Sequence, residues 1–268
     1  MSNESFNLEA YFKRINYQGK TDVTAETLKG LHIAHTLNVP FENLDVHFKK
    51  PIRLDRESLY QKIVENKRGG YCFEMNGMFS FVLKEMGFKV LDVLARGTRD
   101  GKEFFSQSHQ VMVVEIGDEL WLADVGFGND GITAPVLLEE GVDQQQFTHT
   151  YRILKDPKHG YILQSKVDGE YKYMYAFHLI NCHPMDFEMA NYFMATYPNS
   201  FFSIMKMCTM PTKEGRVTLT DIRNEKKFKQ LVNGQVTETN LNSEDEFKEK
   251  LQQYFALDYE AIKQSAAK

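Results

Sequence analysis

The chain has 268 residues, an ordinary apolar content and a formal net charge of -5, with an isoelectric point near 5.9. Such an acidic chain argues against a nucleic-acid-binding surface, and its length suffices for one large core or for two or three smaller ones. Its three cysteines, Cys72, Cys182 and Cys208, are too widely spaced to suggest a disulfide framework or a zinc motif. The sequence shows no leader and no apolar run of membrane-spanning length, so we expect a cytoplasmic protein without a membrane anchor.

Helical patterns dominate residues 1–86. Predicted helices cover residues 7–15, residues 24–38 and a third stretch that begins at Asp55, because capping residues precede apolar side chains at helical spacing. Before the third helix, residues 39–45 combine an aromatic, a carboxylate and an amide side chain. Taken by itself, this segment is predicted to be a turn held by side-chain hydrogen bonds.

Cys72 follows two glycines and opens a run of apolar residues at helical spacing that ends at Gly87. The glycines release the backbone from side-chain sterics, so the pattern places Cys72 in the first turn of a helix. Free N–H groups and the positive end of the helix dipole favour an anion there, and so favour a thiolate. The position fits a nucleophilic cysteine and also a small buried apolar residue, and only a nearby base decides between them.

After Gly87 the apolar side chains alternate with a period of two, which is typical of strands. Turn residues separate the strands, so we predict an antiparallel sheet or a small barrel. A helix over residues 186–195, further strands and a final helix capped by Ser243 follow. The predicted strands are residues 88–97, 109–116, 119–125, 151–154, 161–167, 170–177, 216–219 and 235–239.

The predicted hairpin at Gly117 and Asp118 brings a histidine and a carboxylate together. If these two residues form a two-residue turn, counting back along the strands puts His109 opposite Gly126, with Asp124 as its diagonal neighbour on the same face. Such neighbours have Cα atoms about 7–8 Å apart, within reach of longer side chains. A three-residue turn would reverse the parity and separate them. The pair is a candidate base for the thiol, although a structural histidine bonded to a surface aspartate fits equally well.

The remaining histidines do not form a metal-binding pattern. His32 and His35 lie three residues apart on a predicted helix but have no evident third ligand, and zinc sites use at least three protein ligands. We therefore predict no metal site and assign these histidines a structural or solvent-facing position.

Several separated motifs resemble those of the arylamine N-acetyltransferases of the bacterial type. The string RGGYCFEMN at residues 68–76 is followed by His109 at the start of a valine-rich strand and by DVGFG at residues 124–128, and PFENL occupies residues 40–44. These motifs occur in the family's order and spacing over about residues 7–220, so the resemblance is specific. It implies an α+β fold in three parts similar to that of cysteine proteinases. The parts are a helical bundle (1–86), an antiparallel β-barrel (87–185) and an interdomain helix with an α/β lid (186–268).

The resemblance also implies the roles of individual residues. Cys72, His109 and Asp124 would form a catalytic triad, and Glu42 and Arg68 a buried structural pair near it. The family pattern assigns substrate contacts to Phe41, Tyr71, Phe127 and Phe202, and coenzyme A contacts to Gly126 and Gly128. This chain departs from many relatives near Tyr197 and after Leu219, so coenzyme A contacts from the C-terminal part are not carried over. Lys206, Lys213 and Arg216 remain open between solvated surface charge and phosphate contacts.

The implied activity is acetyl transfer from acetyl-CoA, through an acetyl-cysteine thioester, to the nitrogen of an arylamine or arylhydrazine in a ping-pong mechanism. Acetyl-CoA would be the co-substrate and no metal would be needed, with no nucleic-acid or membrane partner, in a monomer or homodimer. The alternatives are an amide-forming acyltransferase that uses another acyl thioester, a cysteine hydrolase or transglutaminase-like enzyme, and a binding protein with an inactive triad.

Overall fold

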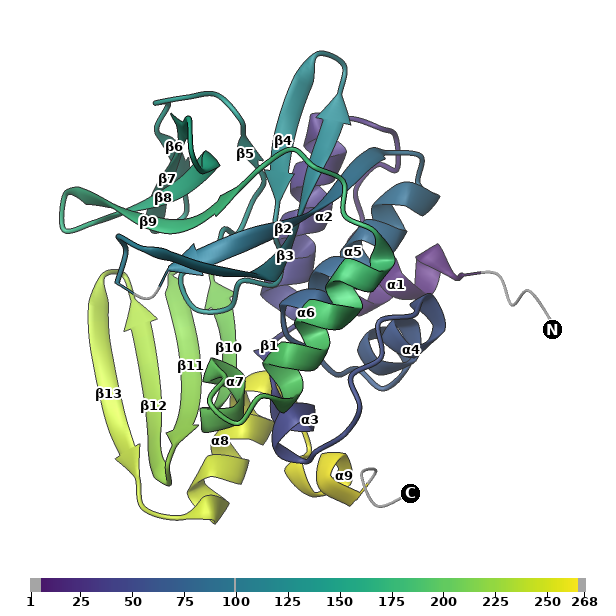
Figure 1. The fold of residues 1–268 in the computed structure, drawn as a ribbon. Helices are drawn as coiled ribbons and strands as arrows, with labels where there is room; N and C mark the ends of the chain where they lie inside the picture. The colour runs from purple at the N-terminus through teal and green to yellow at the C-terminus, as the bar shows by residue number, and fades with distance from the viewer. Residues whose placement is uncertain (1–5, 99, 265–268) are drawn as a thin grey trace.

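The structure is a computed structural model that describes residues 6–98 and 100–264. The outer ends of the first and last predicted parts, residues 1–5 and 265–268, lie outside the described residues. Two antiparallel sheets occupy one side of the molecule, and helices from the N-terminal third pack on the other side (Figure 1). The segregation of helices from antiparallel sheets confirms the predicted α+β class.

The N-terminal helices begin where their capping residues predict. Asn7, Thr24 and Asp55 each accept a hydrogen bond from a backbone N–H in the first turn. The third predicted helix is a short α-helix followed by one π-helical turn, η1. The helices of this part are α1 (Leu8–Arg14), α2 (Ala25–Asn38), α3 (Leu44–His47), α4 (Arg56–Tyr60), η1 (Gln61–Glu65) and α5 (Cys72–Glu85). None of the helices in the described part of the chain is long and apolar enough to cross a membrane.

The larger sheet contains every strand predicted between residues 88 and 177. Its spatial order is β5-β4-β3-β2-β9-β8-β7-β6. Two very short strands, β5 and β6, were not predicted, because two or three residues carry too little periodicity. The strands are β2 (Lys89–Thr98), β3 (Phe104–Ile116), β4 (Glu119–Ala123), β5 (Val136–Leu137), β6 (Gln144–Gln146), β7 (His149–Asp156), β8 (Gly160–Val167) and β9 (Glu170–Phe177). Since β4 ends two residues earlier than predicted, Asp124 lies in the loop beyond it.

The smaller sheet joins the two ends of the chain. Its order is β1-β10-β11-β12-β13, and in it Phe41 pairs with Thr209. The prediction of a simple turn at residues 39–45 is therefore incomplete, because its first residues add an edge strand to a C-terminal sheet. The methionine-rich β10 and the charged β12 were also missed. The strands are β1 (Phe41–Glu42), β10 (Met205–Thr212), β11 (Gly215–Ile222), β12 (Glu225–Val232) and β13 (Gln235–Leu241).

Three clusters of buried apolar residues hold these layers together. The largest lies among the N-terminal helices and the adjoining face of the larger sheet, the second lies within the curved larger sheet, and the third lies between the smaller sheet and the C-terminal helices. Helix α6 lies to the right of the smaller sheet in Figure 1 and contacts β3 of the larger sheet. The C-terminal helices are α6 (Pro184–Thr196), α7 (Phe201–Ile204), α8 (Glu244–Phe255) and α9 (Tyr259–Gln264).

Candidate active site

The thiol of Cys72 lies at the N-terminus of α5, as predicted. The Glu74 carboxylate accepts the N–H of Tyr71, the residue before the helix, at 3.1 Å and so holds the first turn. Cys72 is buried, and its Sγ lies 3.9 Å from the carbonyl oxygen of Ser108. The loop after β4 packs directly on it, since a Cβ added at Gly126 would lie 2.9 Å from the Cα of Cys72. Only glycine allows this approach.

His109 and Asp124 meet, as the parity of the hairpin predicts, although the strand pairing ends at Met112 and Ala123 and does not extend to the predicted pair of His109 with Gly126. The pairing of Ile116 with Glu119 and of Met112 with Ala123 confirms the two-residue turn. The Nε2 of His109 donates to Oδ2 of Asp124 over 2.8 Å, and both residues are buried. The Cys72 side chain lies close enough to the imidazole to raise its pKa. Since Nε2 is bound to the carboxylate, Nδ1 is the nitrogen left for the thiol.

The electrostatics of this cluster favour a charged imidazole. Burial by itself lowers the pKa of His109, but attraction to Asp124, the hydrogen bond to Asp124 and the nearby Cys72 side chain outweigh it and raise the pKa to about 10. For Asp124, burial raises the pKa, and the stronger effects of His109 and of its hydrogen bonds leave it below the usual value. At neutral pH the two groups therefore form a buried ion pair.

Asn76 connects the helix that carries the thiol to the loop that carries the carboxylate. Its Nδ2 donates to Oδ1 of Asp124 at 2.8 Å and to the carbonyl oxygen of Gln110 at 2.6 Å, while its Oδ1 accepts the N–H of Val125 at 2.8 Å. Sequence reasoning gave Asn76 no role. The available signal was its spacing, because a residue four positions after Cys72 lies on the same face of a helix.

His32 supports the backbone beneath the carboxylate. Its Nε2 accepts the N–H of Asp124 at 3.1 Å, so its Nδ1 carries the proton and donates to the carbonyl oxygen of Thr133 at 3.1 Å. Burial lowers the pKa of His32 to about 4, and the ring is neutral. The ring has a structural position, which is one of the two alternatives predicted from the sequence, and it contacts the backbone of the site residue Asp124. Within residues 6–98 and 100–264, no group of three or more potential ligands is placed to hold a metal ion.

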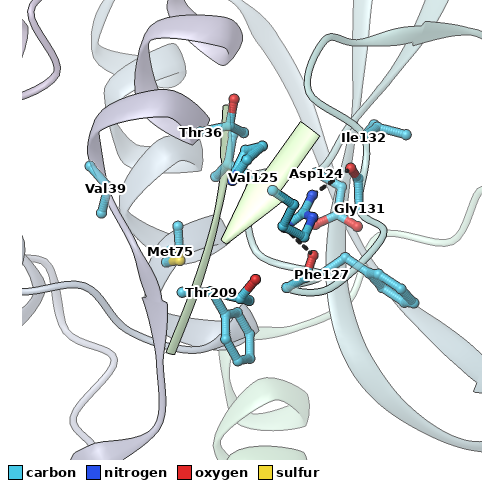
Figure 2. A pocket seen from close by; sticks show the side chains of 13 residues that line it. Thr36, Val39, Met75, Asp124, Val125, Phe127, Gly131, Ile132 and Thr209 are labelled. Carbon is cyan, nitrogen blue, oxygen red and sulfur yellow. Dashed lines mark hydrogen bonds between the residues drawn. The ribbon is translucent and has the colours of Figure 1, made fainter. Parts of the chain in front are cut away.

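A pocket opens beside Asp124, between α2, the loop after β4 and the smaller sheet (Figure 2). The space between its walls is about 280 Å³, which includes the part that is open to solvent. Its lining residues are Thr36, Val39, Phe41, Met75, Asp124, Val125, Phe127, Gly128, Gly131, Ile132, Thr209, Pro211 and Arg216. Three of the predicted binding residues, Phe41, Phe127 and Gly128, therefore line it.

The two other predicted aromatic contacts lie next to this pocket. The ring of Phe202 is 5.9 Å from that of Phe41 and 5.4 Å from that of Tyr71. Tyr71 is fully buried, and its hydroxyl donates to the side chain of Asn191. Its ring therefore supports Phe202 from within the core.

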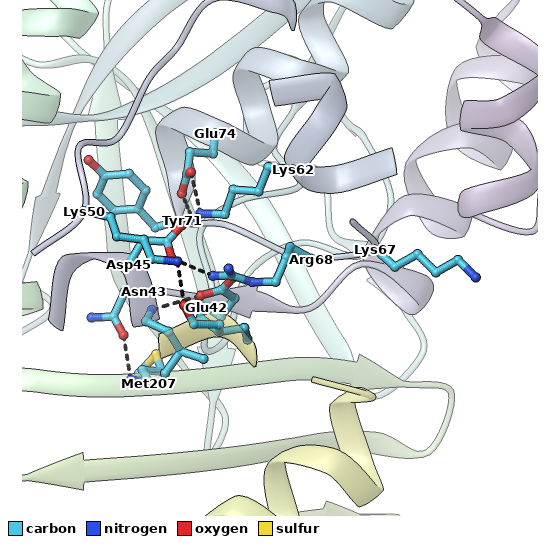
Figure 3. Close-up of polar contacts among 12 residues, drawn as sticks. Glu42, Asn43, Asp45, Lys50, Lys62, Lys67, Arg68, Tyr71, Glu74 and Met207 are labelled. Atoms are coloured by element: carbon cyan, nitrogen blue, oxygen red, sulfur yellow. Dashed lines mark hydrogen bonds and ion pairs between the residues drawn. The ribbon is translucent and has the colours of Figure 1, made fainter. Parts of the chain in front are cut away.

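A network of buried ion pairs fixes the chain before the thiol helix (Figure 3). Arg68 donates to Glu42 at 2.8 Å through Nε and to Asp45 at 3.0 Å through Nη2, so the implied Glu42–Arg68 pair is confirmed. Lys62, on η1, lies 2.7 Å from Asp45 and 2.6 Å from Glu74. Because Glu74 also holds the first turn of α5, the network ties the thiol helix to the edge of the smaller sheet.

Lys62→Met is expected to lower the free energy of unfolding by about 3–5 kcal/mol, because it leaves two buried carboxylates without their shared cation. Urea denaturation measures this. The matched control is Lys89→Met, which removes a solvent-exposed pair with Glu115 and is expected to leave the free energy of unfolding close to that of the wild type. Equal losses in the two variants would contradict the structural role of Lys62.

The fold and the site define an α+β protein in which a helix supplies a buried cysteine, and a hairpin with the loop after it supplies a buried histidine and aspartate. A family model described as N-acetyltransferase matches residues 24–264. The arylamine N-acetyltransferase of Escherichia coli is 38% identical over 216 residues, which cover 80% of this chain and 76% of that protein. That of Mycolicibacterium smegmatis is 33% identical over 223 residues, which cover 80% of each.

Solved structures agree with these relatives. The arylamine N-acetyltransferase from Salmonella typhimurium superposes with a TM-score of 0.87 at 31% identity and covers 97% of both chains. The Mycobacterium marinum arylamine N-acetyltransferase in complex with CoA has a TM-score of 0.86 at 30% identity, with coverage of 96% of this chain and 94% of that one. This chain belongs to the arylamine N-acetyltransferase family, as its motifs predicted.

Proposed function

We propose that the protein transfers the acetyl group of acetyl-CoA to the nitrogen of an arylamine or arylhydrazine through an acetyl-cysteine thioester. Family membership supports the reaction class. The observation that carries the mechanism is the hydrogen bond from His109 to the buried Asp124 beside the Cys72 thiol. The alternative acyltransferase differs only in its acyl donor, and longer acyl-CoA substrates test it.

In the first half-reaction the Cys72 thiolate attacks the thioester carbonyl, and the new C–S bond forms as the bond to coenzyme A breaks. His109 gives its proton to the departing thiolate of coenzyme A and becomes neutral. Backbone N–H groups at the start of α5 are placed to stabilise the oxyanion of the tetrahedral intermediate. One thioester replaces another, so this step is close to isoenergetic.

In the second half-reaction the amine attacks the acetyl-cysteine. An aromatic amine is a free base at neutral pH, so its nitrogen attacks directly and loses a proton to the neutral His109. The Cys72 thiolate leaves, and the thiolate and imidazolium are restored. Asp124 holds the ring in one orientation and stabilises its positive charge in both steps.

The arrangement of the pocket and the adjoining loop supports an assignment of the two substrate-binding surfaces. We assign the acceptor to the aromatic surface of Phe41, Phe127 and Phe202, backed by Tyr71, and coenzyme A to the side-chain-free backbone at Gly126 and Gly128. The three-part division at residues 1–86, 87–185 and 186–268 remains part of the proposal. So do a cytoplasmic location, a monomeric or homodimeric state, and the absence of nucleic-acid and membrane partners.

Intact-mass spectrometry tests the proposal directly. Incubation with acetyl-CoA is expected to add one acetyl group, located on Cys72 by peptide mapping, and subsequent aniline is expected to remove it as acetanilide. A protein that binds acetyl-CoA without gaining the acetyl group would be a binding protein and would contradict the mechanism. Cleavage or crosslinking of casein would favour the hydrolase or transglutaminase alternative.

A further inference from the structure

Arg216, near the start of β11, is buried, with 7% of its surface exposed. Its burial is at odds with the first of the two hypotheses from the sequence, a solvated surface charge. Its Nη1 donates to the carbonyl oxygen of Gly128 at 3.2 Å and its Nη2 to that of Gly131 at 3.4 Å. Arg216 therefore links the smaller sheet to the loop after β4.

The loop held by this guanidinium carries site residues. Phe127 packs edge-on against the imidazole of His109, with ring centroids 5.2 Å apart. Gly128 has a φ of +80°, which favours glycine, and its carbonyl accepts the N–H of Gly131 at 3.1 Å to close a turn. A change in this turn would therefore move Phe127 relative to the imidazole.

Tyr151 holds the same turn from the larger sheet. Its hydroxyl lies 2.9 Å from the carbonyl oxygen of Asp130 and 3.1 Å from that of Gly131. The carbonyl groups of Gly128, Asp130 and Gly131 are thus held by two side chains, one from each sheet. The orientation of the turn therefore depends on the position of the smaller sheet relative to the larger one.

The smaller sheet meets this loop at a second point. The ring of Phe41, on β1, lies against Gly128, where an added Cβ would be 3.2 Å from the ring. β1 and β11 flank β10 in the same sheet. The sheet therefore holds the loop from the side of Phe41 by packing and from the side of Arg216 by hydrogen bonds.

Holding a loop with a buried charged side chain costs desolvation free energy. Burial lowers the pKa of Arg216, and its Nε is buried without a hydrogen-bond partner. Attraction to the Asp130 carboxylate opposes that lowering of the pKa, but the two hydrogen bonds that the guanidinium donates within the described part of the chain both go to neutral carbonyl groups. Neutral carbonyl acceptors offset only part of the desolvation of a guanidinium, so packing stability alone would favour an apolar residue. An apolar residue at this position could not form the two hydrogen bonds to the turn.

We propose that Arg216 is a positioning residue that fixes the turn at residues 128–131 against the smaller sheet and so sets the backbone beside Cys72 for productive binding of acetyl-CoA. It acts through the loop and touches neither the thiol nor the imidazole. This role rests on the proposed function, because that function assigns coenzyme A to Gly126 and Gly128. Its effect falls on binding, of the donor through Gly126 and Gly128 and of the acceptor through Phe127, and leaves the reactivity of the thiol intact.

The test compares Arg216→Met and Arg216→Lys with Arg223→Met, which makes the same change at an exposed residue near the end of β11. Arg216→Met is expected to raise KM for acetyl-CoA by about 10–100-fold, the scale on which small misplacements act, while iodoacetamide alkylates Cys72 within about twofold of the wild-type rate. Arg216→Lys keeps the charge but reaches one carbonyl at most, so it recovers part of the loss. Arg223→Met behaves as wild type.

Hydrogen–deuterium exchange of the free protein gives a readout that does not depend on activity. Arg216→Met is expected to speed exchange in residues 126–131 and to leave α5 and β3 unchanged. Unchanged KM and unchanged loop exchange overturn the proposal, and so does a general loss of protection with loss of thiol reactivity, which indicates a merely structural residue. If the wild type gains no acetyl group, the proposed function fails, and the exchange data alone decide whether Arg216 holds the loop.

Discussion

Cys72→Ala is expected to abolish acetyl transfer and to prevent any acetyl group from remaining on the protein. No other described thiol lies beside the His109 imidazole, since Cys182 and Cys208 lie in other parts of the fold. Loss of the nucleophile from a comparable serine triad costs about 10⁶ in kcat. Steady-state kinetics with acetyl-CoA and an arylamine, together with intact mass after incubation with acetyl-CoA, measure both effects.

The matched control for this prediction is Cys182→Ala, which removes a half-buried thiol before α6. It is expected to keep the activity and the single acetyl group. Thermal unfolding should be similar for the two variants, because each loses a single sulfur atom. Acetylation of Cys72→Ala at the wild-type rate would place the nucleophile elsewhere and would remove the basis of the mechanism.

Asp124→Asn is expected to reduce kcat by about 10⁴, the effect of the same change in a serine triad. The hydrogen bonds of this site give the reason. Oδ1 of Asp124 accepts from both Asn76 and Gly126, so the amide oxygen of an asparagine would stay on that side and its NH₂ group would face His109. Nε2 would then have to accept, and the ring proton would move to Nδ1. The nitrogen that faces Cys72 would no longer act as a base.

The pH dependence of stability provides an independent check on this variant. Since the pKa of His109 in the folded protein, about 10, lies above its ordinary value near 6.5, the charged ring stabilises the fold fully below about pH 6.5. This contribution is lost as the pH rises toward 10. Urea unfolding of the wild type between these limits should show the decrease, and Asp124→Asn should lack it. A histidine NMR titration in which both proteins lose the ring proton at the same pH would contradict the ion pair.

Local sequence rules predicted much of the site because its key relations are local. Cys72 follows two glycines at the start of an apolar helix, and the pairing of His109 with Asp124 follows from a two-residue turn and the period of a strand. Each of these relations involves residues that lie close together in the sequence, within one helix or one hairpin. The family motifs then connected these separate pieces.

Other relations had no local signal. Phe41 joins β10 across more than 160 residues, and nothing in residues 39–45 names that partner. Arg216 looked like a surface or phosphate-binding charge, and only the packing of the smaller sheet on the loop after β4 buries it. His32 supports Asp124 across 92 positions through one ring nitrogen. Such contacts depend on how complete layers are placed.

The amino-acid order by itself therefore determined the helix that presents the thiol, the hairpin that aligns the imidazole with the carboxylate, and the family. Capping, turn geometry and strand alternation act over a few residues and can be read directly from the chain. The tertiary structure alone decided which side chains steady those groups and how the smaller sheet holds the loop beside them. These contacts form because the chain buries several apolar faces at the same time. That burial brings polar groups that are far apart in sequence close together, where they become each other's hydrogen-bond partners.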